Sequence, residues 1–270
     1  MNKRQLANIK IEHQRICNIQ VLGLFVLCAI ALFLFGCGID RNIKKGEKFL
    51  AIGEYYDAAT QFKTAYQRTP AKDRTQRGQL AAKMAFCYDQ ISASQRAIAA
   101  YRNVIRYKQD NKDTHLKLAA NLMKTGAYPE AIKEYSIALD SMPDNDIARE
   151  GLAAATKAPT IKEQGSYYQV KKMDKFNSRK QDYSPMLFGD QYNQLYFTST
   201  RNEAQGDEIS GITGVKPGDI FVSEKDEKGK WGIPHAIESG LNSEADEGTP
   251  AFSVDGREMY ITQCLTDPTY

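Results

Sequence analysis

Residues 112–145 read KDTHLKLAANLMKTGAYPEAIKEYSIALDSMPDN, and this 34-residue pattern occurs three times in the 270-residue chain. The copies span 39–72, 78–111 and 112–145, with a polar insertion around Asp73 to Arg77 between the first two. Small residues recur at offsets 8 and 20 of the unit and an aromatic residue at offset 24. A fixed period of this kind predicts helix–turn–helix units whose small residues let antiparallel helices approach closely.

The spacing resembles the tetratricopeptide repeat, which implies an all-α solenoid over residues 37–157. Gly53 and Gly126 fall at the turn of the first and third units, where glycine adopts a positive φ at little cost. Pro70 and Pro143 are expected just after the second helices. The sequence DIAREGLAAATK, residues 146–157, is predicted to form a capping helix on the last repeat.

Tetratricopeptide arrays bind extended or helical peptides on a concave face lined by the first helix of each repeat. The lysine and asparagine that clamp a terminal carboxylate in chaperone-binding members are absent from offsets 5 and 9. We therefore expect an apolar-centred groove for a protein segment, or else packing of these residues on the chain's own second half. The predicted protein-binding groove comprises Ile43, Glu47, Leu50, Phe86, Asp89, Gln90, Leu116, Ala120, Met123 and Lys124.

Before the repeats, Val21 to Phe35 form an unbroken apolar run, VLGLFVLCAIALFLF, after a polar and basic segment. A membrane span needs roughly 20 apolar residues, whereas a shorter run is typical of a signal-peptide core. The run ends in Leu34-Phe35-Gly36-Cys37, which resembles a bacterial lipobox. The resemblance implies a signal peptide at 1–36 and a lipid on Cys37. The alternative is an uncleaved inner-membrane anchor, which the bulky Phe35 and the long basic segment leave open.

A linker and an entry strand of the β-sheet are expected at 158–175. After them, two segments align with a period of about 65 residues. Asp182-Tyr183-Ser184-Pro185 in the first matches Glu247-Gly248-Thr249-Pro250 in the second. Strands flanking Asp255-Gly256 predict a hairpin. These cues resemble TolB-like, WD-like β-propeller repeats, so residues 176–270 are expected to form one and a half blades. A propeller needs at least four blades, so we expect the chain to be part of a longer protein.

The order of lipobox, tetratricopeptide array and TolB-like repeats resembles the PorE-like periplasmic outer-membrane lipoproteins of Bacteroidota. The fold class implied is α+β multidomain, an all-α solenoid followed by the start of an antiparallel β-propeller. In that family an OmpA-like domain after the propeller binds peptidoglycan, so any such contact would require a domain missing here. The family is associated with type IX secretion and gliding, which implies envelope-protein partners and a lipid anchor facing the periplasm from the outer membrane.

Charge and motif content narrow the function classes. The formal charge of +3 arises in the first 20 residues and the remainder sums to zero, which argues against a nucleic-acid partner. Nucleophile, metal or phosphate-loop motifs are absent from the sequence, so we expect no enzyme activity, cofactor or metal. The acidic cluster Glu244, Asp246 and Glu247 lacks the spacing of a calcium loop and is expected to be a solvated loop. Cys87 is expected to be a buried thiol.

The expected function is that of a non-enzymatic, lipid-anchored scaffold that links a secretion or gliding apparatus to the cell envelope. One alternative is a glycan- or nutrient-uptake lipoprotein, which would present aromatic platforms for sugars. Another is the non-catalytic half of a periplasmic peptidase, which would carry a hydrolase domain after Tyr270.

Overall fold

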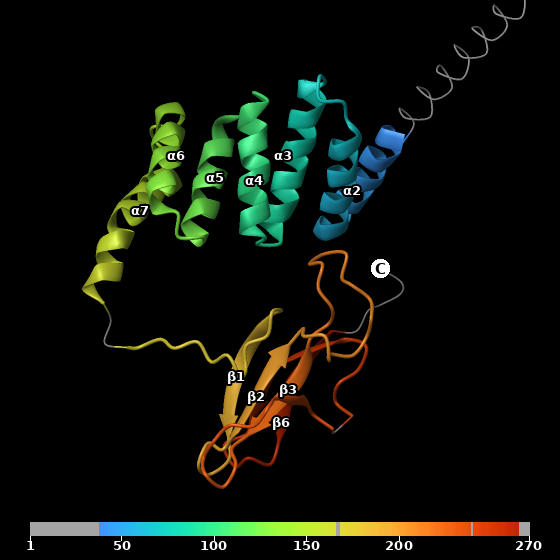
Figure 1. Ribbon diagram of the computed structural model, residues 1–270, viewed down its shortest axis with the longest axis vertical. Helices are drawn as coiled ribbons and strands as arrows, with labels where there is room; N and C mark the ends of the chain where they lie inside the picture. Colours follow the sequence, from blue (N-terminus) through green and yellow to red (C-terminus); the bar gives the residue numbers. More distant parts are fainter. Residues whose placement is uncertain (1–37, 166–167, 239, 265–270) are drawn as a thin grey trace, which may run out of the picture. The chain divides into compact units, whose positions relative to one another are not determined.

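The computed structural model of the protein (Figure 1) describes residues 38–165, 168–238 and 240–264. The chain divides after Thr156 into a helical unit and a unit that contains the β-strands. Each unit is described by itself. The predicted signal peptide and Cys37 lie outside the described residues.

The helical unit is a solenoid of successive antiparallel helices (Figure 1), which confirms the predicted helical repeats. Its first described helix spans residues 38–51. Each predicted repeat contributes one helical hairpin, and neighbouring helices along the chain pack against one another. The remaining helices are α2 (Tyr55–Arg68), α3 (Arg74–Gln90), α4 (Ser94–Arg106), α5 (Lys112–Lys124), α6 (Tyr128–Ser141) and α7 (Asp146–Gln164).

The repeated small and aromatic residues form the core of the helical unit. The alanines at offset 20, Ala58, Ala97 and Ala131, have no exposed surface. The aromatic residues at offset 24 fill the space between units and are at most 5% exposed. At Gly46 even one added carbon would lie 2.7 Å from the Phe62 ring. The helices therefore approach each other at positions where a larger side chain has no room.

The structure differs from the sequence prediction at two helix boundaries. The polar insertion between the first two repeats forms the start of α3, where Asp73 Oδ1 accepts a hydrogen bond from Gln76 N at 3.0 Å. An aspartate in this position satisfies a free amide of the first turn, so the inserted residues extend the helix. The linker expected from residue 158 is wrong in its first part, because α7 continues to Gln164 with Pro159 inside it. A proline inside a helix removes a backbone donor and crowds the carbonyl four residues earlier, yet α7 continues beyond Pro159.

The second unit contains a four-stranded antiparallel sheet in the order β1-β2-β3-β4 and a separate β5–β6 hairpin. Gly256, with φ of +68°, lies in the predicted hairpin turn between β5 and β6. Six strands in the described residues do not close a propeller, so the propeller remains a prediction. The strands are β1 (Asp182–Phe188), β2 (Gln194–Ser199), β3 (Asp219–Glu224), β4 (His235–Ala236), β5 (Asp246–Phe252) and β6 (Met259–Cys264).

The hairpin and the four-stranded sheet pack together through aromatic rings. Phe252 of β5 stacks on Phe188 of β1 with ring centroids 4.0 Å apart, and meets Tyr196 of β2 edge-on at 4.9 Å. On the other side of the sheet, Trp231 meets Phe176 edge-on at 5.4 Å. Trp231 therefore packs against the segment that precedes β1.

The two aligned segments also share an unusual backbone feature. Ser184 in β1 and Thr249 in β5 have positive φ angles of 51° and 52°. In both strands the pairing register shifts at this point, which is the mark of a β-bulge. The residue before proline thus adopts the same left-handed conformation in both copies, so the sequence repeat is also a structural repeat.

The close approach at Gly46 generates a stability prediction. Gly46→Val places a branched side chain against the buried Phe62 ring and should lower the free energy of unfolding of the helical unit by about 2 kcal/mol. Ala51→Val, an exposed position of the same helix, is the matched control. Urea unfolding, followed by circular dichroism at the helical band, measures the free energy of unfolding of both variants. Equal midpoints for the two variants would contradict the packing described here.

Candidate functional site

The structure places all ten predicted groove residues on the first helices of the three repeats. Residues 43, 47 and 50 lie on the helix over 38–51, residues 86, 89 and 90 on α3, and the other four on α5. None of the ten is buried. Ile43, Leu50, Leu116 and Met123 are half-buried and pack with one side on the core. The predicted residues thus share one side of the solenoid, and their role in binding remains a prediction.

Polar contacts among and beside the predicted groove residues join the first helices of neighbouring repeats. Glu47 Oε1 pairs with Lys83 Nζ at 2.5 Å, between the first and second repeats. Asp89 accepts a hydrogen bond from Asn121 Nδ2 at 2.8 Å and lies 3.6 Å from Lys124 Nζ, between the second and third repeats. Both predicted acidic residues are therefore paired with a lysine, which leaves little net negative charge in the groove.

Phe86 is the exposed aromatic residue among the predicted groove positions, with 37% of its surface accessible. Its ring meets the Tyr55 ring edge-on at 6.1 Å, and Lys117 Nζ lies 5.8 Å from the ring centroid. Sequence reasoning missed Lys83 and Lys117, which both occupy offset 6, and Asn121 at offset 10. Each is next to a predicted offset, so widening the pattern by one position would have found them.

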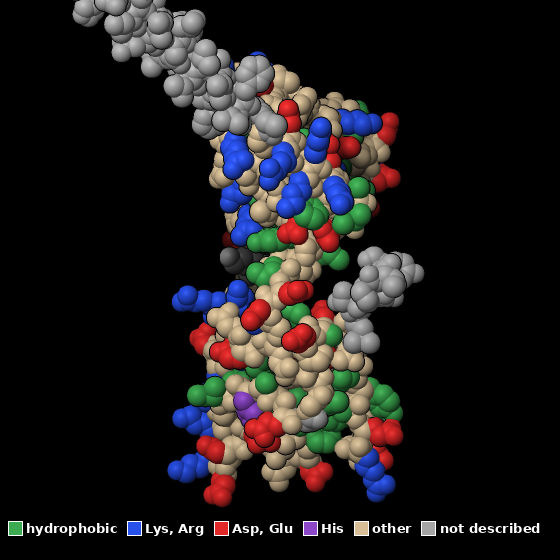
Figure 2. All heavy atoms as spheres, turned by 90° about the vertical axis from the view of Figure 1, so that its right-hand side faces the viewer, with side chains coloured by type: hydrophobic (Ala, Val, Ile, Leu, Met, Phe, Trp, Pro, Cys, Tyr) green, Lys and Arg blue, Asp and Glu red, His purple; other side chains and the backbone are tan. Residues whose placement is uncertain are grey.

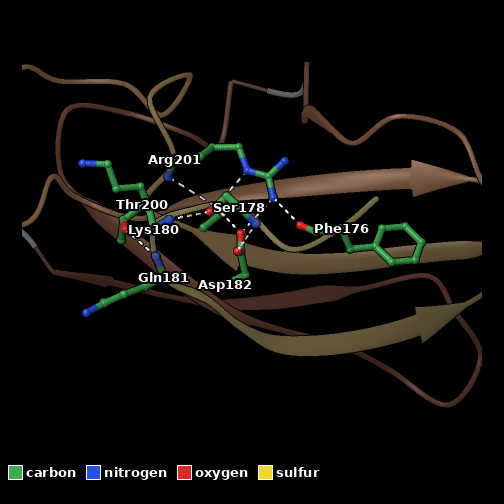
Figure 3. Close-up of polar contacts among 8 residues, drawn as sticks. Phe176, Ser178, Lys180, Gln181, Asp182, Thr200 and Arg201 are labelled. Atoms are coloured by element: carbon green, nitrogen blue, oxygen red, sulfur yellow. Dashed lines mark hydrogen bonds and ion pairs between the residues drawn. The ribbon is translucent and has the colours of Figure 1, made fainter. Parts of the chain in front are cut away.

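A second polar cluster lies in the β-unit around Asp182, at the start of β1 (Figure 3). Its carboxylate accepts hydrogen bonds from Ser178 N at 2.6 Å, Ser199 Oγ at 2.7 Å and Arg201 Nη2 at 2.8 Å. Arg201 also donates to the Phe176 carbonyl at 2.8 Å. The Asp182 and Arg201 side chains are only 11% and 12% exposed. Burial opposes ionisation of Asp182, but the hydrogen bonds from Ser199, Arg201 and Ser178 together lower its pKa.

The second copy repeats this arrangement with Glu247 in place of Asp182. Glu247 is fully buried and accepts hydrogen bonds from Ser243 N at 3.0 Å and Gln263 Nε2 at 2.8 Å. Asp246 accepts one from Gly218 N at 2.7 Å. The expectation that Glu244, Asp246 and Glu247 form a solvated loop is therefore wrong for Glu247, which is buried in β5, whereas Glu244 and Asp246 are exposed. The Asp182 and Glu247 clusters therefore join the start of a strand to neighbouring segments.

The described residues contain no group of three or more histidine, cysteine, aspartate or glutamate side chains that could hold a metal ion. His115 Nδ1 lies 2.6 Å from Glu134 Oε2 and joins α5 to α6. Cys87 is fully buried, as expected, and burial raises the pKa of its thiol to about 11. Among the helices that the structure describes, none is long and apolar enough to cross a membrane.

Comparisons with known proteins give distant similarities. No protein-family model matches the chain. A stretch of 152 residues is 24% identical to the DnaJ homolog subfamily C member 3 of Gallus gallus, covering 53% of this chain and 28% of that protein. The chain therefore spans less than a third of the length of this curated relative.

Among solved structures, the MamA protein is 20% identical with a TM-score of 0.40, over 47% of this chain and 66% of MamA. The C-terminal tetratricopeptide-containing domain of a Plasmodium falciparum FK506-binding protein is 16% identical with a TM-score of 0.41, over 47% of this chain and 92% of that one. These values are low, so the solenoid assignment depends on the helices and their packing described above.

The buried Asp182–Arg201 pair predicts a pH-dependent stability. Because the pKa of Asp182 is lowered in the folded state, its stabilising effect is complete above about pH 4, the usual range of an unfolded aspartate. The effect is lost as the pH falls through the lowered folded value. Asp182→Asn should therefore destabilise the β-unit at pH 7 by about 3 kcal/mol, and the difference from wild type should shrink in acid.

The matched control is Asp174→Asn, which removes an exposed carboxylate paired with Lys172. A surface pair contributes about 0–1 kcal/mol, so this variant should unfold like wild type. Denaturation followed by Trp231 fluorescence, at several pH values, reports on the β-unit. If Asp182→Asn were as stable as Asp174→Asn at pH 7, the buried pair would not stabilise the fold as described.

Proposed function

We propose that this protein is a non-enzymatic, lipid-anchored scaffold whose helical repeats bind a segment of a partner protein at the periplasmic face of the outer membrane. The observation that supports it is the row of predicted groove residues along one side of the three first helices. There the exposed Phe86 lies among half-buried aliphatic side chains, and the neighbouring charges are already paired.

This arrangement suits a protein segment with apolar side chains. Solenoid repeats present extended concave surfaces that bind partners. An aromatic residue surrounded by aliphatic and paired polar groups resembles the energetic centre of a protein interface. The lysine and asparagine of a carboxylate clamp are absent from offsets 5 and 9, so the partner is expected to bind through side chains within its sequence.

The anchoring and the envelope location follow from the sequence resemblances. The lipobox-like ending at Cys37 comes immediately before the first helix, so a lipid there would hold the solenoid near the membrane. The four-stranded sheet with the following hairpin is compatible with one and a half blades of a TolB-like propeller. Together, the order of these parts favours a scaffold of the PorE-like kind, with proteins of a secretion or gliding apparatus as partners.

Site-specific crosslinking tests the groove. A photoreactive residue replaces Phe86 in one variant and Met123 in a second, within the full-length protein in its own cell envelope. Because both positions lie in the groove, they should yield the same discrete adduct. A third variant carries the label at Gln67, an exposed position of α2, and should yield none. Adducts of the same mass from all three positions, or from none, would refute binding in this groove.

The anchor is tested by the mass of the mature protein. Mass spectrometry of the amino-terminal peptide from the outer-membrane fraction should show an acylated Cys37 as the first residue. The Cys37→Ser variant should retain its apolar leader and lose the lipid. If the protein were found in the inner membrane with Met1 intact, it would carry an uncleaved membrane anchor and no lipid. The groove could still be tested separately.

A further inference from the structure

Three arginines and two tyrosines converge at one edge of the helical unit. Tyr107, just after α4, lies with its hydroxyl 3.2 Å from that of Tyr66 in α2. Arg77 Nη1 and Arg106 Nη2 donate to the Tyr107 hydroxyl at 3.2 and 3.3 Å. The guanidinium carbon of Arg74 lies 5.6 Å from the centre of the Tyr107 ring. We call these five side chains the arginine–tyrosine cluster.

The cluster has positive charge without a matching carboxylate. Within the part of the chain that the structure describes, Arg74, Arg77 and Arg106 form no ion pair with an aspartate or glutamate. Arg74 donates to the Arg106 carbonyl at 2.9 Å and Arg77 to the Thr69 carbonyl at 3.0 Å. Each guanidinium has five N–H donors, so these bonds to helix ends leave several donors unused.

The surroundings of Tyr107 already favour a negatively charged oxygen. The hydrogen bonds from Tyr66 and Arg77, with the nearby charge of Arg106, lower the pKa of Tyr107 to about 8, although burial works against them. The Arg74 and Arg106 side chains are exposed; Arg106 contacts this hydroxyl, and Arg74 lies over the Tyr107 ring. An oxyanion beside Tyr107 would meet the same donors and the same charge as the phenolate.

The wider charge distribution of this half of the solenoid also favours anions. Residues 38–108 contain fourteen lysines and arginines against six aspartates and glutamates. The net charge of the chain after its first 20 residues is zero, which argued against a nucleic-acid partner, but the first half of the solenoid is strongly basic. Figure 2 shows lysine and arginine side chains gathered on one face of the helical unit. Such a field attracts anions and raises their local concentration.

We propose that the arginine–tyrosine cluster is a binding site for a phosphate group. The unused donors of Arg74 and Arg106 and the hydroxyl of Tyr107 supply hydrogen bonds to its oxygens, since planar guanidinium groups bind phosphate in a bidentate manner. The phosphate is either a free ion or the terminal group of a phosphomonoester. This site is separate from the groove and does not depend on the lipid anchor.

Calorimetric titration of the full chain in detergent with inorganic phosphate tests the site. Wild type should bind with saturation at one site. Arg106→Gln and Arg74→Gln should each weaken binding at least about tenfold, the loss expected for a hydrogen bond to a charged group. The control is Arg102→Gln, one turn earlier in α4, whose exposed side chain pairs with Glu130. It removes the same charge and should bind phosphate like wild type.

Sulfate, which keeps its charge between pH 7 and pH 9, tests the role of Tyr107 without titration of the ligand. Its affinity should fall as the pH rises through about 8, because the Tyr107 phenolate then repels it. Tyr107→Phe should abolish this pH dependence while the arginines still bind the anion. Glycerol 3-phosphate distinguishes a free phosphate ion from a phosphomonoester as the ligand. A phosphomonoester site binds it as tightly as inorganic phosphate, whereas a site for the free ion binds it more weakly.

Three results would overturn the proposal. Wild-type protein that binds neither phosphate nor sulfate has no such site. If Arg102→Gln and Arg106→Gln weakened phosphate binding equally, the loss would come from the net charge and not from a specific site. Unchanged binding in both Arg74→Gln and Arg106→Gln would place the anion elsewhere. Circular dichroism of each variant confirms that the solenoid is intact before binding is compared.

Discussion

The distance at which antiparallel helices pack is the constraint on which the helical unit depends. Alanine or glycine at the contact positions permits a close approach, and one aromatic ring per repeat then fills the remaining space. Because every repeat packs at the same depth, the first helices align along one side of the solenoid. Contacts such as Glu47 with Lys83 and Asp89 with Asn121 require this alignment. The proposed groove is therefore a product of the core.

The same constraint explains how far the sequence could predict the fold. The small and aromatic residues recur with a fixed period, and their burial follows directly from that period. Helix ends depend on weaker and more local effects. Asp73 was counted within an insertion, although it caps α3, and the last helix was predicted over residues 146–157, although α7 continues to Gln164. A single cap or proline changes the free energy by an amount that neighbouring packing can exceed.

The candidate sites were predicted to different degrees for a related reason. Groove positions follow from their offsets in the repeat, so their helices were assigned correctly. The arginine–tyrosine cluster escaped notice because Arg74 and Arg106 lie on different helices and meet only after the solenoid forms. The buried carboxylates were also missed. Three neighbouring acids suggest a solvated loop, and only the folded β-unit shows that Glu247 receives hydrogen bonds from Ser243 and Gln263.

The repeated strand in the β-unit has a consequence for how such a chain can change in evolution. Ser184 and Thr249, like Asp182 and Glu247, are separated by 65 residues. Each copy has a hydrogen-bonded carboxylate at the start of its strand and a bulge after it. Unequal recombination between the two copies would remove or duplicate one period, and each remaining copy would keep its own bulge before the proline. The number of copies can then vary among descendants without the origin of a new strand. One recombination event would change the number of copies, and selection would act on the result.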